Sequence, residues 1–357
     1  MSSVTPGPVP PHKQRQPVDD VFAGLCVLDL SLDVAGQYCA RLFADQGAEV
    51  VLPENPDGHP LRRHGPFDAD GHSLAFLHVT LGKQVVPDAD RATLLAASDV
   101  VVAPAADVTL LRAKAPKAAI IVGTSSFGAD GPMATWRGPE IVVQAMSGMM
   151  NNNGVPGRPP LYGMGDRASY AAGVAAHAGA VAALLARDGL RPGSGTGRGQ
   201  DVLVDVAEAA AAMCFPYVMQ HEYNGTDRRR GDQDIPAMQV RCQGTWICIW
   251  VYAFRFAAMC QALGLPGLVT DARFADPTDR EANWSAFAAE VQAALVQADA
   301  EDVVARLQAA QVIASVAYRP GQLSLSPHLA ARSYWHEEKR TGRALLGRAF
   351  RVTAATR

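Results

Sequence analysis

The chain has 357 residues, a formal net charge of −3 at pH 7, and a composition that is 48% hydrophobic and 19% charged. This length is sufficient for two domains. The nearly balanced charge argues against a nucleic-acid partner, which would need a strongly basic face. Glycine or a charged residue interrupts every apolar run before the roughly 20 residues of a membrane span, so we expect no membrane segment.

Residues 1–21 are rich in proline and polar side chains and lack an apolar run, so we expect a disordered tail and not a signal peptide. The six cysteines are scattered, form no C-x-x-C pair and lie mostly in apolar runs. This is typical of small buried residues in a reducing compartment, and we expect a cytoplasmic protein. The nine histidines show no H-E-x-x-H spacing, and we expect no metal ion.

From residue 22 onward, short apolar runs alternate with amphipathic segments. The run 25–30 (LCVLDL) is followed by a turn at 33–36, helical spacing over 37–46 and a second apolar run at 49–52. The pattern recurs, with helices expected at 89–97 and 108–115 and strands at 100–102 and 119–122. Strand–turn–helix–strand units are typical of right-handed parallel crossovers. The alternation predicts an α/β fold with an open parallel sheet, whose ligands bind beyond the carboxyl ends of the strands.

The pattern becomes mainly helical after residue 140. We expect helices at 141–150, 169–187 and 202–217, and then a polar linker at 221–235. Beyond the linker we expect strands at 245–251 and 312–317 and helices at 254–263, 280–297, 300–310 and 327–332. The chain therefore divides into a tail (1–21), a large domain (22–220), the linker (221–235), a smaller α+β domain (236–340) and a C-terminal return to the large domain (341–357).

Several blocks of sequence, in order along the chain, resemble one family. They include GLCVLDLS at 24–31, LFADQGAEV at 42–50, SFGADGP at 126–132, TGRGQ at 196–200 and SPHLAAR at 326–332. Together they resemble the class III CoA-transferases of the CaiB/BaiF type over roughly residues 22–352. The resemblance implies a Rossmann-like large domain, a smaller domain and two chains interlocked as a dimer. It also implies transfer of CoA between carboxylic acids, with acyl-CoA racemases among the relatives.

The resemblance further implies an Asp nucleophile that attacks an acyl-CoA thioester and forms an acyl–aspartyl anhydride. A carboxylate needs no separate base for this attack, and backbone N–H groups stabilise the developing oxyanion. In the family the nucleophile precedes a glycine by four residues. Counting back from Gly173 gives Ser169, whereas Asp166 lies three residues further upstream.

Two interpretations of Asp166 stay open. It is either the nucleophile, displaced by most of one helical turn, or the N-cap of the following helix. As a nucleophile, Ser169 would need an adjacent base, which the sequence does not place beside it; its alternative role is to satisfy N–H groups at the helix start. Glu140 lies where transferases carry an acidic residue. It is a candidate acid or base, or a helix-start carboxylate favoured by the helix dipole.

The resemblance places CoA contacts at seven positions: Val34, Ala35, Asn55, Arg62, Lys83, Ala103 and Arg137. Several depart from the family pattern. The loop after 100–102 lacks the usual Glu-Asn-Phe, and Gln84 stands where an Arg is usual. Because CoA has a highly charged nucleotide end, fewer donors predict weaker binding. Arg62 and Lys83 remain phosphate candidates, or ordinary surface charges.

Three functions stay open on these grounds. The first is a homodimeric CoA-transferase that acts through Asp166 on an acyl-CoA and an organic acid. The second is a non-catalytic subunit that forms a heterodimer with a catalytic paralogue. The third is a repurposed enzyme that uses the same scaffold without CoA, because a fold alone does not determine function.

Overall fold

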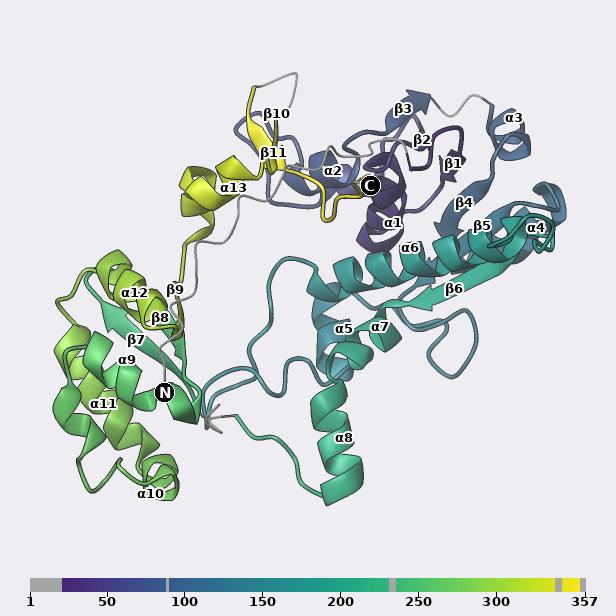
Figure 1. Ribbon diagram of the computed structural model, residues 1–357. Coiled ribbons are helices and arrows are strands. Elements are labelled where there is room, and N and C mark those ends of the chain that lie inside the picture. Colours follow the sequence, from purple (N-terminus) through teal and green to yellow (C-terminus); the bar gives the residue numbers. More distant parts are fainter. Residues whose placement is uncertain (1–20, 88–89, 231–235, 338–341, 354–357) are drawn as a thin grey trace. The chain divides into compact units, whose positions relative to one another are not determined.

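The computed structural model describes residues 21–87, 90–230, 236–337 and 342–353. Apart from Val21, the expected tail at 1–21 lies outside the described residues. The chain forms two compact units (Figure 1). The first contains the residues up to Arg230 and those from Leu345 onward, and the second runs from Gly231 to Ala344.

The first unit is built on a six-stranded sheet with the order β3-β2-β1-β4-β5-β6, in which every neighbouring pair is parallel. The strands are β1 Cys26–Asp29, β2 Glu49–Glu54, β3 Gln84–Pro87, β4 Val100–Pro104, β5 Ile120–Ser125 and β6 Asp201–Asp205. The helices are α1 Val34–Ala44, α2 Leu74–Val79, α3 Arg91–Ala96, α4 Val108–Lys114, α5 Glu140–Met146, α6 Arg167–Asp188, α7 Val206–Met213 and α8 Phe215–Asn224. The predicted open parallel sheet is therefore confirmed.

Helices cover both faces of this sheet, which explains its continuous apolar strands. Successive residues of β4 illustrate the arrangement. Val100 and Val102 pack on one side with α1 and α6, whereas Val101 packs on the other side with α3 and α4. All three side chains are fully buried.

The helix expected at 202–217 is wrong in its first part, because residues Asp201–Asp205 form the edge strand β6. Val202 and Val204 face the core beside α6, whereas Leu203 is 56% exposed. This alternation is the period of a strand covered on one face. The helical segment also extends further than expected, since α8 continues to Asn224, within the predicted linker.

Small side chains allow α6 to pack closely within its own unit. A Cβ atom on Gly173 would lie 2.8 Å from the carbonyl oxygen of Ala35, in the first turn of α1. A Cβ atom on Gly179 would lie 2.7 Å from a methyl group of Val202 in β6. By length and hydropathy alone, α6 is the one helix among the described residues that could cross a membrane. Its apolar composition matches this packing against α1 and β6.

The second unit contains an antiparallel sheet with the order β7-β8-β9, formed by Ala237–Cys242, Thr245–Trp250 and Ile313–Val316. Its helices are α9 Phe256–Ala262, α10 Pro277–Ala282, α11 Trp284–Leu295, α12 Ala300–Ala309 and α13 Pro327–Ala331. The expected helix at 280–297 is thus two helices that meet at Asn283. Two short strands, β10 Trp335–Glu337 and β11 Ala344–Leu346, form a separate two-stranded sheet. The second unit is the predicted α+β fold.

Candidate active site

Asp166 lies directly before the first residue of α6, in the left-handed backbone region with φ 54° and ψ 38°. Non-glycine residues rarely adopt this conformation, which costs of order 1–3 kcal/mol. The Asp166 carboxylate makes no capping hydrogen bond to the helix. Its Oδ2 atom lies instead 2.9 Å from Nε2 of His64, which directly follows the short 3₁₀ helix Pro60–Arg63.

The carboxylate of Glu140, the first residue of α5, caps α6 in place of Asp166. Its Oε1 accepts from the Ala168 amide at 2.6 Å. Its Oε2 accepts from the Ser169 amide at 3.2 Å and from the Ser169 hydroxyl at 2.7 Å. The side-chain amide of Gln144 also donates to Oε1, through Nε2 at 2.7 Å. A carboxylate has about four acceptor sites, and these four donors occupy them. Glu140 is therefore a capping residue, and Ser169 is one of the groups that it binds.

Gln144 fixes the segment that leads into Asp166. Its side-chain amide donates to the Gly163 carbonyl at 2.8 Å and accepts from the Gly163 N–H at 3.0 Å. The Gln144 side chain is fully buried. Helix α5 thus holds both Gly163 and Ser169, which lie on either side of Asp166. Contacts of these flanking residues therefore fix the position of Asp166, and its carboxylate makes no hydrogen bond to the N–H groups of α6.

A group of aromatic side chains lies next to Asp166. The Tyr170 ring packs edge-on against Tyr38 and His78, with centroid distances of 4.8 and 5.9 Å. Burial and the negative charge of Asp166 raise the pKa of Tyr170 to about 12, so its hydroxyl stays protonated. Burial and the nearby guanidinium of Arg41 lower the pKa of His78 to about 4, so its imidazole is neutral at pH 7.

Arg41 connects this group to the C-terminal segment of the first unit. Its Nη1 lies 2.7 Å from Nδ1 of His78 and donates to the His78 carbonyl at 2.7 Å. Its Nη2 donates to the Leu346 carbonyl at 2.9 Å. The chain end from Leu345 onward is therefore held on α1 by a buried arginine that also contacts the aromatic group beside Asp166.

The Lys83 ammonium, a predicted phosphate contact, is engaged by other groups of the first unit. Its side chain is fully buried. Its Nζ donates to Asp29 Oδ2 at 2.7 Å, to the Gln37 carbonyl at 2.7 Å and to Gln37 Oε1 at 2.9 Å. An ammonium has three donors, and all three are used inside the first unit. In this conformation Lys83 forms a buried ion pair with Asp29 and has no N–H left for a phosphate.

Arg62 is engaged in a bidentate pair with Glu54, with contacts of 2.5 and 2.8 Å, and its guanidinium lies over the Phe76 ring. This pair lowers the pKa of Glu54, chiefly through the hydrogen bond from Arg62. A phosphate would have to compete with that carboxylate. Asn55 is exposed, and its Oδ1 lies 3.4 Å from an Arg91 nitrogen.

The remaining predicted CoA contacts differ in accessibility. Val34 and Ala35 are buried in the first turn of α1, and Ala103 is buried in β4, so that only their backbone could meet a ligand. Arg137 is exposed in the loop before α5. Val34, Asn55 and Ala103 lie at the carboxyl ends of β1, β2 and β4, the edge where ligands bind in open parallel sheets.

The Gly-rich turn 196–200 lies at the opposite edge, because it precedes β6. Its Gly199 N–H donates to the Lys117 carbonyl at 2.9 Å. A Cβ atom on Gly199 would lie 2.0 Å from the Ala119 carbonyl oxygen, so only glycine fits there. This turn is structural.

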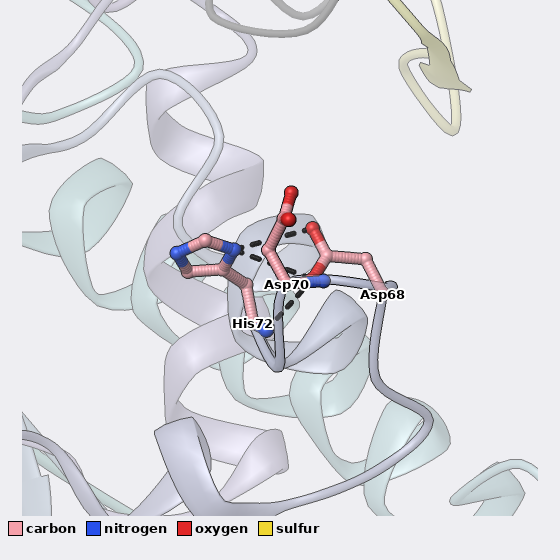
Figure 2. Close-up of side chains that lie close together, drawn as sticks. All are labelled: Asp68, Asp70 and His72. Atoms are coloured by element: carbon pink, nitrogen blue, oxygen red, sulfur yellow. Dashed lines mark hydrogen bonds and ion pairs between the residues drawn. The ribbon is translucent and has the colours of Figure 1, made fainter.

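A loop cluster has the ligand types that metals prefer. Figure 2 shows Asp68, Asp70 and His72, whose ligating atoms lie within 4.8 Å of one another. However, Asp68 Oδ1 accepts from the Asp70 and His72 amides at 3.0 and 2.8 Å. Asp68 Oδ2 lies 3.3 Å from Nδ1 of His72. These contacts are those of a local side-chain-to-backbone turn.

His64 was not among the residues predicted from sequence. It lies 102 positions before Asp166 in the chain, and no spacing rule connects two residues that the fold alone brings together. The only sequence signal is its place shortly after the second strand, at the ligand-binding edge of the sheet.

The sequence model that defines CoA-transferase family III matches residues 22–356 of this chain. The chain therefore belongs to this family. It is 30% identical to the acetyl-CoA:oxalate CoA-transferase of Acetobacter aceti over 80% of this chain and 76% of that protein. It is 28% identical to the succinyl-CoA–D-citramalate CoA-transferase of Chloroflexus aurantiacus over 90% of this chain and 83% of that protein.

Solved structures agree on the fold. A CaiB/BaiF family protein from Brucella suis superposes with a TM-score of 0.79 at 23% identity, over 93% of this chain and 96% of that one. Rv3272 from Mycobacterium tuberculosis superposes with a TM-score of 0.76 at 26% identity, over 93% of this chain and 92% of that one.

Proposed function

We propose that this chain transfers CoA between an acyl-CoA thioester and a small carboxylic acid, with Asp166 as the nucleophile. One observation carries this assignment: Glu140 caps α6, so the Asp166 carboxylate is free of the helix and faces His64. The relatives support the substrate class, since their names pair CoA thioesters with oxalate, D-citramalate and mesaconate.

The proposed reaction needs no added base. An Asp166 oxygen attacks the thioester carbonyl carbon, a C–O bond forms, the C–S bond breaks, and CoA thiolate leaves with the electron pair. The product is an acyl–Asp166 anhydride. CoA thiolate then attacks Cγ of Asp166, which releases the first acid as a carboxylate and leaves an Asp166–CoA thioester. The second acid attacks this thioester and releases thiolate, and thiolate attack on the acyl carbon of the new anhydride gives the new acyl-CoA and frees Asp166. The amino end of the 22-residue helix α6 lies next to this centre, and its dipole favours the negative charge of the carboxylate and of the oxyanion.

Trapping with hydroxylamine tests the nucleophile. The protein is incubated with acetyl-CoA or succinyl-CoA and hydroxylamine, and the modified residue is located by peptide mass spectrometry. We expect a hydroxamate at Asp166 and none in the Asp166→Asn variant. Asp188, at the other end of α6, is the matched control and should stay unmodified. An unmodified Asp166, under conditions that label the Acetobacter aceti enzyme, would refute the assignment.

A heteromeric assembly is the second candidate. The chain is 31% identical over 206 residues, 52% of its length, to the subunit BbsE of a Thauera aromatica succinyl-CoA:(R)-benzylsuccinate CoA-transferase. Helix α8 buries none of its side chains, and its exposed Phe215, Val218 and Tyr223 suit a subunit contact. Light scattering on the purified chain distinguishes the options: a homodimer with full transferase activity contradicts the heteromer.

A further inference from the structure

His64 is placed by its own backbone contacts before it meets Asp166. Its N–H donates to the Leu61 carbonyl at 3.1 Å, and its carbonyl accepts from the hydroxyl of Ser73, the N-cap of α2. The ring then reaches Asp166 with an Nε2–Oδ2 distance of 2.9 Å. Because an ionised carboxylate can only accept hydrogen bonds, Nε2 must be the protonated nitrogen in this contact.

Stability does not account for this contact. The His64 side chain is 43% exposed and that of Asp166 is 17% exposed. Ion pairs at such exposed positions contribute about 0–1 kcal/mol. The helix gains nothing either, because Glu140 already binds the amides that Asp166 would cap. The contact therefore combines a left-handed backbone at Asp166 with no gain in helix capping, and an unusual backbone conformation of this kind is typical of functional sites.

The two carboxylate oxygens of Asp166 have different surroundings. Oδ2 is held by His64, whereas no described residue donates a hydrogen bond to Oδ1. Oδ1 is therefore the oxygen available for attack on a thioester. After that attack, Oδ2 becomes the carbonyl oxygen of the Asp166 side of the anhydride, and the His64 N–H still points at it.

We infer that His64 directs the reaction at Asp166 by donating from Nε2 to Oδ2; this inference rests on the proposed function. When CoA thiolate attacks Cγ of Asp166, the S–Cγ bond forms, the bond from Cγ to the acyl oxygen breaks, and the first acid leaves as a carboxylate with the electron pair. The negative charge of the tetrahedral intermediate develops on Oδ2. A donor already aimed at that atom stabilises it without rearrangement.

The test compares the His64→Ala and His64→Gln variants with the wild-type protein. The readout is the rate at which an isotopically labelled acid exchanges into its own CoA thioester. The thioester is the one, acetyl-CoA or succinyl-CoA, that gives a hydroxamate at Asp166 in the trapping experiment, so the second acid need not be known. We expect His64→Ala to lower the exchange kcat by about 10-fold or more. Deleting a fully enclosed oxyanion donor costs about 10²–10³-fold, and His64 is half exposed. The KM for the thioester should change little.

Rescue separates donation from a structural role. Gln retains an N–H donor, so His64→Gln should recover part of the exchange rate. Free imidazole should restore His64→Ala in part and leave Asp166→Asn inactive. His72→Ala, a change of another exposed histidine on the same connection between β2 and α2, is the matched control and should exchange at the unchanged rate. Thermal unfolding of each variant verifies that it is folded.

The outcomes distinguish the two proposals. Absence of a label on Asp166 in the unchanged protein overturns the proposed function. A labelled Asp166 together with an unchanged exchange rate in His64→Ala overturns the inference about His64 alone. A loss in His64→Ala that neither Gln nor imidazole reverses also overturns it, because the residue would then act through packing.

Discussion

Glu140 binds Ser169 twice, through the amide and through the hydroxyl, and in doing so takes over the first turn of α6 from Asp166. Ser169 lies 29 positions after Glu140 in the chain, and the contact joins α5 to α6. Its consequence is chemical: a carboxylate that would satisfy a helix end is instead available beside His64. The predictions below test this division of roles.

Replacing Glu140 with Gln should destabilise the first unit. The Gln side chain keeps one oxygen and places an N–H₂ group against amides that need an acceptor. Loss of a helix cap and an unpaired buried donor together cost about 1–3 kcal/mol. Chemical denaturation measures the change. Glu208→Gln on α7, an exposed position, is the control, and an equal effect of both substitutions would contradict the capping role.

Ser169 and Asp166 should respond differently to substitution. Ser169→Ala removes one hydrogen bond to Glu140, so we expect a loss of stability of about 1 kcal/mol with transferase activity largely retained. Asp166→Asn should abolish activity with little effect on folding, because its carboxylate does not cap the helix. Activity and unfolding are measured on the same samples. An inactive Ser169→Ala alongside an active Asp166→Asn would reverse the assignment of the nucleophile.

Stability should decrease as the pH falls below about 6.5. Burial lowers the pKa of His177 to about 4, and burial together with Arg41 does the same for His78. An unfolded histidine titrates near 6.5, so between about 6.5 and 4 the unfolded chain binds more protons than the folded one. The expected slope is up to about 1.4 kcal/mol per pH unit for each histidine.

Unfolding free energies at pH 7, 6 and 5 measure that slope. His177 packs against Phe43, with a centroid distance of 4.3 Å, so His177→Phe keeps an aromatic ring at the site and should remove its share of the slope. His221→Gln, at an exposed position on α8, should leave the slope unchanged. Identical slopes for both variants and the unchanged protein would contradict the prediction.

Lys83→Met should be among the most damaging substitutions. It leaves Asp29 buried without its partner, and breaking one side of a buried ion pair costs about 3–5 kcal/mol. The exposed Lys114→Met on α4 serves as the control. Thermal unfolding checks stability, and calorimetry with CoA checks affinity in the folded fraction. A stable Lys83→Met variant with weakened CoA binding would restore Lys83 as a phosphate ligand.

The sheet was predictable because its signal is local. Strand β4 begins with three consecutive valines, Val100–Val102, and such an apolar run favours a strand buried on both faces wherever it lies in the chain. The edge strand β6 was missed for a related reason. Its five residues run directly into α7, and only pairing with β5, such as Val122 with Val202, distinguishes it from the start of a helix.

The sequence alone was enough to place the chain in its family, to predict an α/β fold and to draw attention to Asp166 and Ser169, because each of these depends on residues near one another in the chain. The roles at the site depend on contacts between distant segments. His64 meets Asp166 across 102 positions, and Lys83 meets Asp29 across 54. Whether a carboxylate caps a helix or faces a histidine, and whether a lysine is buried or exposed, depends on which partner the fold brings within about 3 Å.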